Sequence, residues 1–194
     1  MVNTDEHVCV GPVRRILEAA RFAGEKHAGQ KRKGLAKEPY INHLIEVAEL
    51  IAASSETLDT NLVMAGLLHD TIEDTDATAQ ELQERFGSDV TGLVLEATDD
   101  KSLPKETRKA LQIENAPHKS PRAQTLKLAD KISNLRSILA SPPAEWSPER
   151  RRQYGEWARQ VVSRFSLPNS FLRAEFDSTY AALMESINEP GRRS

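Results

Sequence analysis

Residues 65–75 read AGLLHDTIEDT, an apolar run that ends abruptly on His69 and Asp70. Two further carboxylates, Glu73 and Asp74, follow within the next turn. Side chains four positions apart share one face of a helix, so a helix that continues through this stretch brings these four polar groups to one spot. Partly buried charges beside leucines need a charged partner or a metal ion. The stretch therefore predicts a site for a divalent cation.

Apolar residues recur at helical spacing along most of the chain, and no run alternates in the manner of a β-strand. Glycine, proline and helix-capping residues separate the periodic segments. Tyr154 and Trp157, three positions apart in one such segment, are expected in the core. We predict an all-α single domain of about eight to ten helices. The predicted helical segments are 13–26, 41–52, 59–71, 78–86, 90–97, 104–115, 120–139, 147–165 and 171–187.

Length and composition indicate a globular protein. The chain has 194 residues, of which 39% are hydrophobic and 28% charged. Its formal net charge of −3 gives no global attraction to DNA or to an acidic membrane, so a bound anion needs a local basic patch. No apolar stretch approaches the roughly 20 residues that span a bilayer, and the N-terminus does not resemble a signal peptide. We therefore expect a cytoplasmic protein with no membrane or DNA partner.

The ends of the chain differ in character from its middle. Residues 1–11 are polar and lead into a Gly-Pro pair, which predicts a flexible leader. The tail at 189–194 contains a Pro-Gly pair and is expected to fray. The predicted folded domain is 12–188. The single cysteine, Cys9, excludes an internal disulfide and a multi-cysteine zinc site.

Two other predicted helices carry side chains of the type that binds metals. His43 lies in the first turn of its helix, and Asp130 shares a polar stripe with Asn134. Each has an ordinary alternative, since His43 fits a packed core histidine and Asp130 fits a solvated helix face. Together with His69 and Asp70 they form an imidazole and carboxylate set suited to Mn²⁺, Fe²⁺, Zn²⁺ or Co²⁺.

Such a set suggests hydrolytic chemistry. A bound divalent ion polarises a phosphoryl oxygen and lowers the pKa of a water molecule toward neutrality. Glu73 and Asp74, one turn beyond the ligands, are placed to orient that water or to carry its proton. The basic loop 26–37, KHAGQKRKGLAK, could clamp an anionic substrate through Arg32, or could be an ordinary solvated loop. The residues alone indicate metal-dependent hydrolysis of a phosphorylated small molecule.

The set His43, His69-Asp70 and Asp130 resembles the HD superfamily of metal-dependent phosphohydrolases. Longer strings resemble the hydrolase domain of RelA/SpoT-type alarmone enzymes, above all the stand-alone small alarmone hydrolases, also called metazoan SpoT homologues. These strings are KHAGQKRK, PYINH, AGLLHDTIEDTD, FGSDVTGLVLEATDDKSLP, LKLADKISNLR and EWSPERRRQYGEWARQVV. The resemblance covers roughly residues 13–185 and implies an HD-domain helical bundle.

The resemblance also implies roles for individual residues. It implies that one Mn²⁺ is bound by His43, His69, Asp70 and Asp130. It implies catalytic roles for Glu73 and Asp74, and substrate contacts for Arg32, Lys33, Tyr40, Lys101 and Asn134. The implied reaction removes the 3′-pyrophosphate from ppGpp or pppGpp and gives GDP or GTP. The hydrolase region fills the chain, so we expect no synthetase or regulatory domain.

Other interpretations use the same residues. The site could serve an NADPH 2′-phosphatase or another nucleotide phosphohydrolase, because those substrates also carry a ribose-bound phosphate near a purine. An inactive nucleotide-binding module predicts a broken ligand set or a broken Glu73-Asp74 pair, and neither occurs. A purely structural helical domain leaves the polar motifs on interior helices unexplained. The sequence leaves open the preferred substrate, the metal used in the cell, the role of Cys9 and the oligomeric state, including a homo-oligomer.

Overall fold

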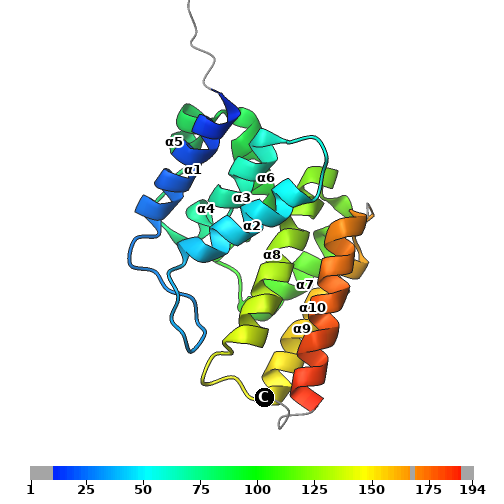
Figure 1. The fold of residues 1–194 in the computed structure, drawn as a ribbon. Helices are drawn as coiled ribbons and strands as arrows, with labels where there is room; N and C mark the ends of the chain where they lie inside the picture. Colours follow the sequence, from blue (N-terminus) through cyan, green and yellow to red (C-terminus); the bar gives the residue numbers. More distant parts are fainter. Residues whose placement is uncertain (1–10, 167–168, 189–194) are drawn as a thin grey trace, which may run out of the picture.

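The computed structural model describes residues 11–166 and 169–188, and these are helical apart from loops and one isolated β-bridge between Lys31 and Pro39 (Figure 1). The all-α prediction is confirmed. The helices are α1 (Pro12–Lys26), α2 (Ile41–Ala53), α3 (Thr60–Leu68), α4 (Thr71–Asp74), α5 (Ala79–Phe86), α6 (Ser88–Ala97), α7 (Lys105–Asn115), the 3-10 helix η1 (Ala116–His118), α8 (Pro121–Ala140), α9 (Pro148–Ser163) and α10 (Ser170–Asn188). No helix in the described ranges combines the length and apolarity needed to cross a bilayer. The predicted tail and, apart from Gly11, the predicted leader with Cys9 lie outside these residues.

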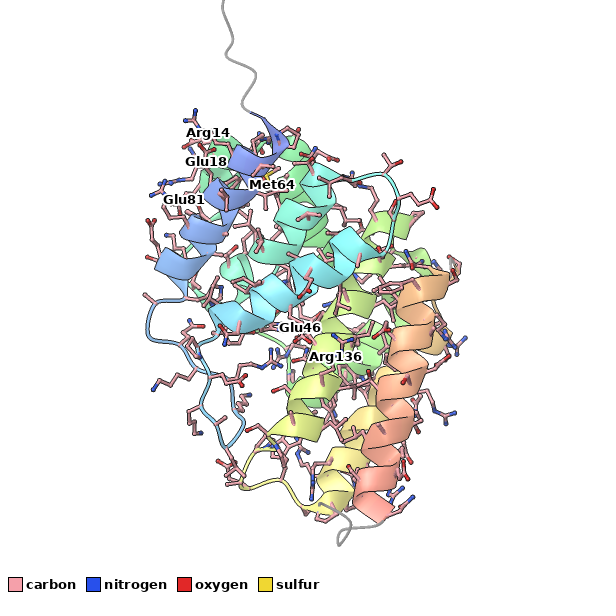
Figure 2. All side chains as sticks on the ribbon, in the orientation of Figure 1. Arg14, Glu18, Glu46, Met64, Glu81 and Arg136 are labelled. Carbon is pink, nitrogen blue, oxygen red and sulfur yellow. The ribbon has the colours of Figure 1, made fainter. Side chains whose placement is uncertain are left out.

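The first helix shows how helical spacing separates two faces. Ala19, Phe22 and Ala23 lie three and four positions apart and are buried. Arg14 and Glu18 lie on the outer face, where they form an ion pair of 3.0 Å (Figure 2). The apolar face therefore turns α1 inward against α3.

Helix starts agree with prediction where a capping side chain precedes the helix. The Oγ1 of Thr78 accepts a hydrogen bond from the Glu81 amide at 3.1 Å, and Ser120 Oγ accepts one from the Ala123 amide at 3.2 Å. Ser147 caps α9 in the same way. Prolines stand at the start of α8 and α9, where the missing N–H would have had no partner in the helix.

Helix α8 lies in the middle of the bundle. It packs against α2, α6 and α10 and also touches α3 and α9, with α9 and α10 on one side of it in Figure 1. Twelve of its side chains are buried, and polar Asp130 and Ser133 are among them. Buried polar groups need partners, so the side chains that face this helix decide what the interior can do.

Helices α2 and α3 approach each other closely at Gly66. A Cβ atom at this position would lie 2.7 Å from Ile51 Cδ1 and 3.3 Å from Ala48 Cα. A larger residue would therefore require the Ile51 side chain and the Ala48 backbone to shift. The close approach leaves the rings of His43 and His69 only 5.2 Å apart between centroids.

The prediction of one helix over residues 59–71 is wrong in its last turn. Helix α3 ends at Leu68, and His69 and Asp70 form a turn before α4 begins. His69 Nδ1 lies 2.8 Å from the Gly66 carbonyl oxygen, and Thr71 Oγ1 donates to the Leu68 carbonyl oxygen at 2.6 Å. In an unbroken helix both carbonyls accept backbone amides, so these side chains compete with the helical pattern.

Candidate active site

Four side chains of the type that binds metals meet where α2, the end of α3 and α8 come together. His43 Nε2 lies 3.4 Å from Asp130 Oδ1 and 3.6 Å from Asp70 Oδ2. His69 Nε2 lies 3.2 Å from Asp70 Oδ2 and 3.8 Å from Asp130 Oδ1. In particular, ligand atoms of His43, His69 and Asp130 lie within 4.8 Å of one another, a spacing that can hold a metal ion. Residues distant in the sequence thus form one cluster.

The His69 ring has the hydrogen-bonding state of a metal ligand. Its Nδ1 faces the carbonyl oxygen of Gly66, which can only accept, so Nδ1 carries a proton. Its Nε2 is buried, has no hydrogen-bond partner and faces two carboxylates. Such an atom is unfavourable unless a proton or a cation occupies the space beside it. Two imidazoles and two carboxylates form a donor set that fits a divalent metal ion.

The charged groups of the cluster shift one another's pKa. Burial lowers the pKa of the His69 imidazole, but the charges of Asp70 and Asp130 outweigh burial and raise the pKa to about 10. Burial raises the pKa of Asp70, yet the neighbouring His69 and His43 hold it well below its usual range. The pKa of Asp130 is also held low against the effect of burial, mainly by Lys131. In the metal-free protein a proton on His69 therefore offsets part of the carboxylate charge.

Metal-free protein should lose stability as the pH rises. The raised pKa of His69 means that its contribution to folding is complete below the ordinary value of about 6.5 and is lost as the pH rises through about 10. Asp70 and Asp130 have depressed pKa values, so their contribution is complete above the ordinary value of about 3.9 and is lost only on acidification. The melting temperature in a chelator should therefore fall between about pH 6.5 and pH 10.

Thermal unfolding with and without Mn²⁺ across this pH range tests the expectation. Added Mn²⁺ should remove most of the alkaline loss, because the cation replaces the proton on His69. The His69→Gln variant has no imidazole to titrate, so its metal-free profile should be flatter. A wild-type melting temperature that stays level from pH 6.5 to pH 10 in a chelator would contradict the expected charge balance.

Neighbouring side chains hold the two carboxylates in place. Tyr40 Oη donates to Asp70 Oδ2 at 2.6 Å. Asn134 Nδ2 donates to Asp130 Oδ1 at 2.6 Å, and the buried Lys131 Nζ donates to Asp130 Oδ2 at 3.1 Å. Tyr40 and Asn134, predicted to contact substrate, therefore also touch the predicted metal ligands.

The predicted catalytic pair lies in α4 and has partners of its own. Glu73 Oε2 accepts a hydrogen bond from the Asp99 amide at 3.2 Å, and its Oε1 lies 3.6 Å from Arg108. Burial raises the pKa of the Glu73 carboxyl above its usual range, which suits a group that exchanges protons during a reaction. Asp74 accepts a hydrogen bond from Lys101. Lys101, a predicted substrate contact, thus pairs with a predicted catalytic residue.

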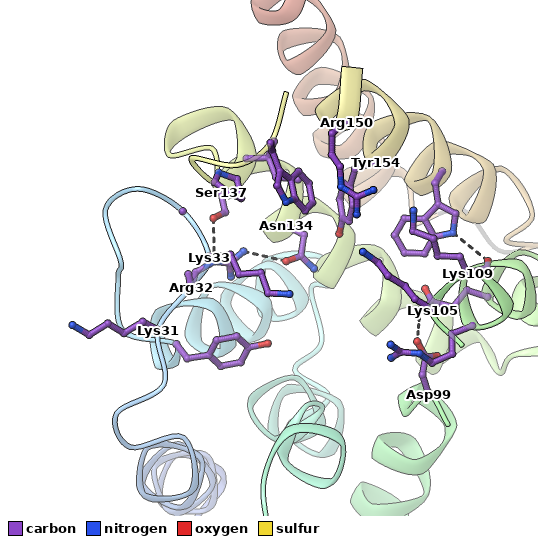
Figure 3. A pocket seen from close by; sticks show the side chains of 18 residues that line it. Lys31, Arg32, Lys33, Asp99, Lys105, Lys109, Asn134, Ser137, Arg150 and Tyr154 are labelled. Atoms are coloured by element: carbon purple, nitrogen blue, oxygen red, sulfur yellow. Dashed lines mark hydrogen bonds between the residues drawn. The ribbon is translucent and has the colours of Figure 1, made fainter. Parts of the chain in front are cut away.

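Figure 3 shows the side chains that line a cavity of about 330 Å³, two of which contact the cluster. Tyr40 and Asn134 belong to its wall and also donate hydrogen bonds to the carboxylates, so these two residues join the cavity wall to the cluster. The rings of Trp146, Tyr154 and Trp157 form another part of the wall. Seven basic side chains line the cavity, namely Lys31, Arg32, Lys33, Lys105, Arg108, Lys109 and Arg150. In a protein whose net charge is −3, this concentration of cations suits a polyanion.

The basic loop between α1 and α2 is attached to α8. Arg32 Nη2 donates to Asn134 Oδ1 at 3.1 Å, and Arg32 Nε donates to Ser137 Oγ at 3.1 Å (Figure 3). Gly34 packs so tightly against Ser141 that a Cβ atom would overlap the Ser141 carbonyl oxygen. The alternative of a purely solvated loop is therefore wrong for Arg32. The attached loop places Arg32 and Lys33 in the cavity wall.

The prediction that Tyr154 and Trp157 lie in the core is wrong in part. Both rings are only partly buried against the core, and both line the cavity. Helical periodicity identifies the apolar face of a helix but does not distinguish a face that covers the core from one that borders a cavity.

Further cavity residues were not predicted from the sequence. Lys105, Arg108 and Lys109 lie on α7 at spacings of three and four, so they share one face. Arg150 lies in the first turn of α9, with its guanidinium 5.1 Å from the Trp146 ring centroid. The spacing on α7 is a signal for a common basic surface, although most such surfaces are simply solvated.

Comparison with known proteins agrees with this geometry. The model of the HD domain family matches residues 19–161. The guanosine-3′,5′-bis(diphosphate) 3′-pyrophosphohydrolase MESH1 of Xenopus tropicalis is 47% identical over 165 residues, covering 85% of this chain and 92% of that protein. MESH1 of Homo sapiens is 51% identical over 148 residues, covering 76% of this chain and 83% of that protein. A solved structure described as a metazoan ortholog of SpoT that hydrolyzes ppGpp matches with a TM-score of 0.82 at 44% identity, covering 86% of this chain and 94% of that chain. These matches confirm the resemblance seen in the motifs, and the chain belongs to the HD domain family.

Proposed function

We propose that this chain removes the 3′-pyrophosphate from ppGpp and pppGpp, releasing pyrophosphate and GDP or GTP. The observation that carries the proposal is that Tyr40 and Asn134, which hold the carboxylates of the histidine–aspartate cluster, also line a cavity with seven basic side chains. A nucleotide with phosphate groups on both sides of its ribose needs cationic groups at two places. Relatives named ppGpp 3′-pyrophosphohydrolases, 44–51% identical, support the same activity. Residues 12–188 would form the hydrolase domain, and its cytoplasmic location stays a prediction.

The cluster would hold one Mn²⁺ through His43, His69, Asp70 and Asp130. Carboxylates suit Mn²⁺, and imidazoles suit most first-row metals. When bound, the ion supplies Lewis-acid polarisation of the phosphoryl group and lowers the pKa of a water molecule. The hydrogen bonds from Tyr40 and Asn134 keep the two carboxylates oriented toward the shared space.

Glu73 is the general base in this proposal. Its carboxylate is a stronger base than an exposed one, because burial raises its pKa, and it accepts a proton from the attacking water. The Asp99 amide and Arg108 hold its two oxygens in fixed positions. Asp74, paired with Lys101, lies in the same turn and orients that water.

The cavity residues hold the remainder of the nucleotide. Arg32 and Lys33 of the attached loop bind one phosphate group, to which both side chains bring positive charge. Lys105 of α7 reaches into the cavity from the opposite side (Figure 3). Trp146 and Tyr154 offer ring surfaces on which a purine can stack.

Purified protein in Mn²⁺ should release pyrophosphate from ppGpp and pppGpp faster than it releases phosphate from NADPH. Initial rates for the three substrates at equal concentration, with pyrophosphate and phosphate measured separately, make the comparison. A chelator should abolish turnover, and excess Mn²⁺ should restore it. Phosphate release from NADPH without pyrophosphate release from either alarmone would overturn the proposed substrate. Turnover that survives chelation would overturn the metal-dependent mechanism.

A further inference from the structure

His43, Ser133 and Glu46 form a hydrogen-bonded row. The row begins at Nδ1 of His43, on the side of the ring opposite the atom that faces Asp70 and Asp130. His43 Nδ1 is 2.8 Å from Ser133 Oγ, and both residues are buried. Ser133 Oγ lies 2.6 Å from Glu46 Oε2, which belongs to the same helix as His43. Ser133 therefore stands between the imidazole and a carboxylate.

The hydrogen positions in this row follow from counting donors. Ser133 has one hydroxyl hydrogen, and the ionised Glu46 carboxylate can only accept, so that hydrogen lies between Ser133 and Glu46. The contact between His43 and Ser133 then needs a proton on Nδ1 of His43. In the neutral ring this leaves a lone pair on Nε2, which is the atom that faces Asp70 and Asp130. This is the tautomer that can bind a metal ion through Nε2.

Arg136, at the end of the row away from His43, orients the Glu46 carboxylate. Arg136 Nη1 donates to Glu46 Oε1 at 3.1 Å, and Arg136 Nη2 donates to Glu175 Oε2 at 2.5 Å. Figure 2 shows Glu46 and Arg136 side by side at the meeting of α2 and α8. A guanidinium always donates, so the carboxylate oxygen that faces it must accept. The other oxygen of Glu46 is thereby directed to Ser133.

We propose that Glu46 is a positioning residue that acts through Ser133 to fix the tautomer of His43 and so sets the affinity of the site for its metal ion. This inference rests on the proposed metal site. The other imidazole, His69, is fixed by the backbone carbonyl of Gly66, which no substitution removes. His43 instead depends on two side chains, and mutation can change both.

Replacing Glu46 with glutamine should reverse the proton order of the row. The amide oxygen would face Arg136, so the amide NH₂ would face Ser133 and donate to it. Ser133 would then donate its own hydrogen to Nδ1 of His43, and the ring proton would move to Nε2. Glu46→Gln should therefore weaken Mn²⁺ binding by about 10- to 100-fold, the range seen when partners of metal-binding histidines are altered.

Calorimetric titration of Mn²⁺ into metal-free protein measures this effect without any activity assay. Ser133→Ala should weaken binding by about tenfold, because His43 loses the acceptor that selects its tautomer. Adding Glu46→Gln to Ser133→Ala should weaken Mn²⁺ binding by less than about a further twofold, because without the serine hydroxyl Glu46 no longer contacts His43 through the row. Glu175→Gln, which changes only the outer end of the row, is the matched control and should bind Mn²⁺ like the wild type. Melting temperatures of the metal-free variants show whether each one is folded.

The outcomes separate the two proposals. Wild-type protein that binds no Mn²⁺ would overturn the proposed metal site. Wild-type protein that binds Mn²⁺, with Glu46→Gln and Ser133→Ala binding equally tightly, would overturn the role of Glu46. If Glu46→Gln weakened Mn²⁺ binding equally in the wild-type protein and in the Ser133→Ala variant, Glu46 would not act through the serine. If Glu46→Gln does not fold, Ser133→Ala alone still decides whether the row controls metal affinity.

Discussion

The Glu73→Gln variant is expected to lose two to four orders of magnitude in kcat on ppGpp, which is roughly what a general base contributes to a reaction. Glutamine has nearly the same shape and can still accept the hydrogen bond from the Asp99 amide, so the turn should keep its structure. It cannot take a proton from water. The measurement is kcat at saturating substrate and Mn²⁺, beside a calorimetric titration of Mn²⁺ into each protein.

Metal binding by this variant tests the division of roles within the site. The affinity for Mn²⁺ should stay near the wild-type value, because Glu73 lies in α4 and pairs with Asp99 and Arg108. The exposed Glu114 of α7 provides a control, since Glu114→Gln should leave kcat unchanged. A Glu73→Gln protein that no longer binds Mn²⁺ would show that Glu73 is a ligand.

The Asp70→Asn variant should bind Mn²⁺ more than about 100-fold more weakly than the wild type, and its turnover should fall to background. This loss is larger than the roughly 10- to 100-fold expected when a residue that only supports a ligand is replaced. The amide can still accept the hydrogen bond from Tyr40, so the change removes a charge and leaves the packing intact. Both histidine Nε2 atoms lie within 3.6 Å of Asp70 Oδ2, and the lost charge is therefore at the centre of the cluster.

Tyr40→Phe is the matched control for Asp70→Asn. It removes the hydroxyl that touches Asp70 but keeps the carboxylate, so the loss of Mn²⁺ affinity should be about tenfold. If Asp70→Asn binds Mn²⁺ as tightly as the wild type, the ion is held by His43, His69 and Asp130 alone.

Local features of the chain were predictable where the cause lies within a few residues. Thr78, Ser120 and Ser147 each accept a hydrogen bond from the backbone three residues on, and α5, α8 and α9 begin directly after them. The end of α3 was not predictable. Ile72 keeps the helical spacing from Leu68, while the side chains of His69 and Thr71 bond to carbonyl oxygens that an unbroken helix would use.

Contacts between distant segments explain most of what the sequence did not show. Ser133 and Glu46 are 87 positions apart, and no spacing in the sequence links Ser133, within LKLADKISNLR, to Glu46, which lies outside every motif quoted above. Trp157 was predicted in the core, because nothing in α9 itself shows that a cavity lies beside that helix. The predicted metal ligands could be proposed from the sequence, since His69 and Asp70 directly follow an apolar run and a partly buried charge needs a partner.

The attachment of the basic loop to α8 has a kinetic consequence. Arg32 is held by Asn134 and Ser137, and the Ala36 amide donates to Ser141 Oγ at 2.8 Å, so the cations are in position before a ligand arrives. The basic loop is therefore already ordered, and the entropic cost of ordering it is absent from the association step. The capture rate of a polyanion is then governed by diffusion and by the field of the cavity, and it falls as salt screens that field.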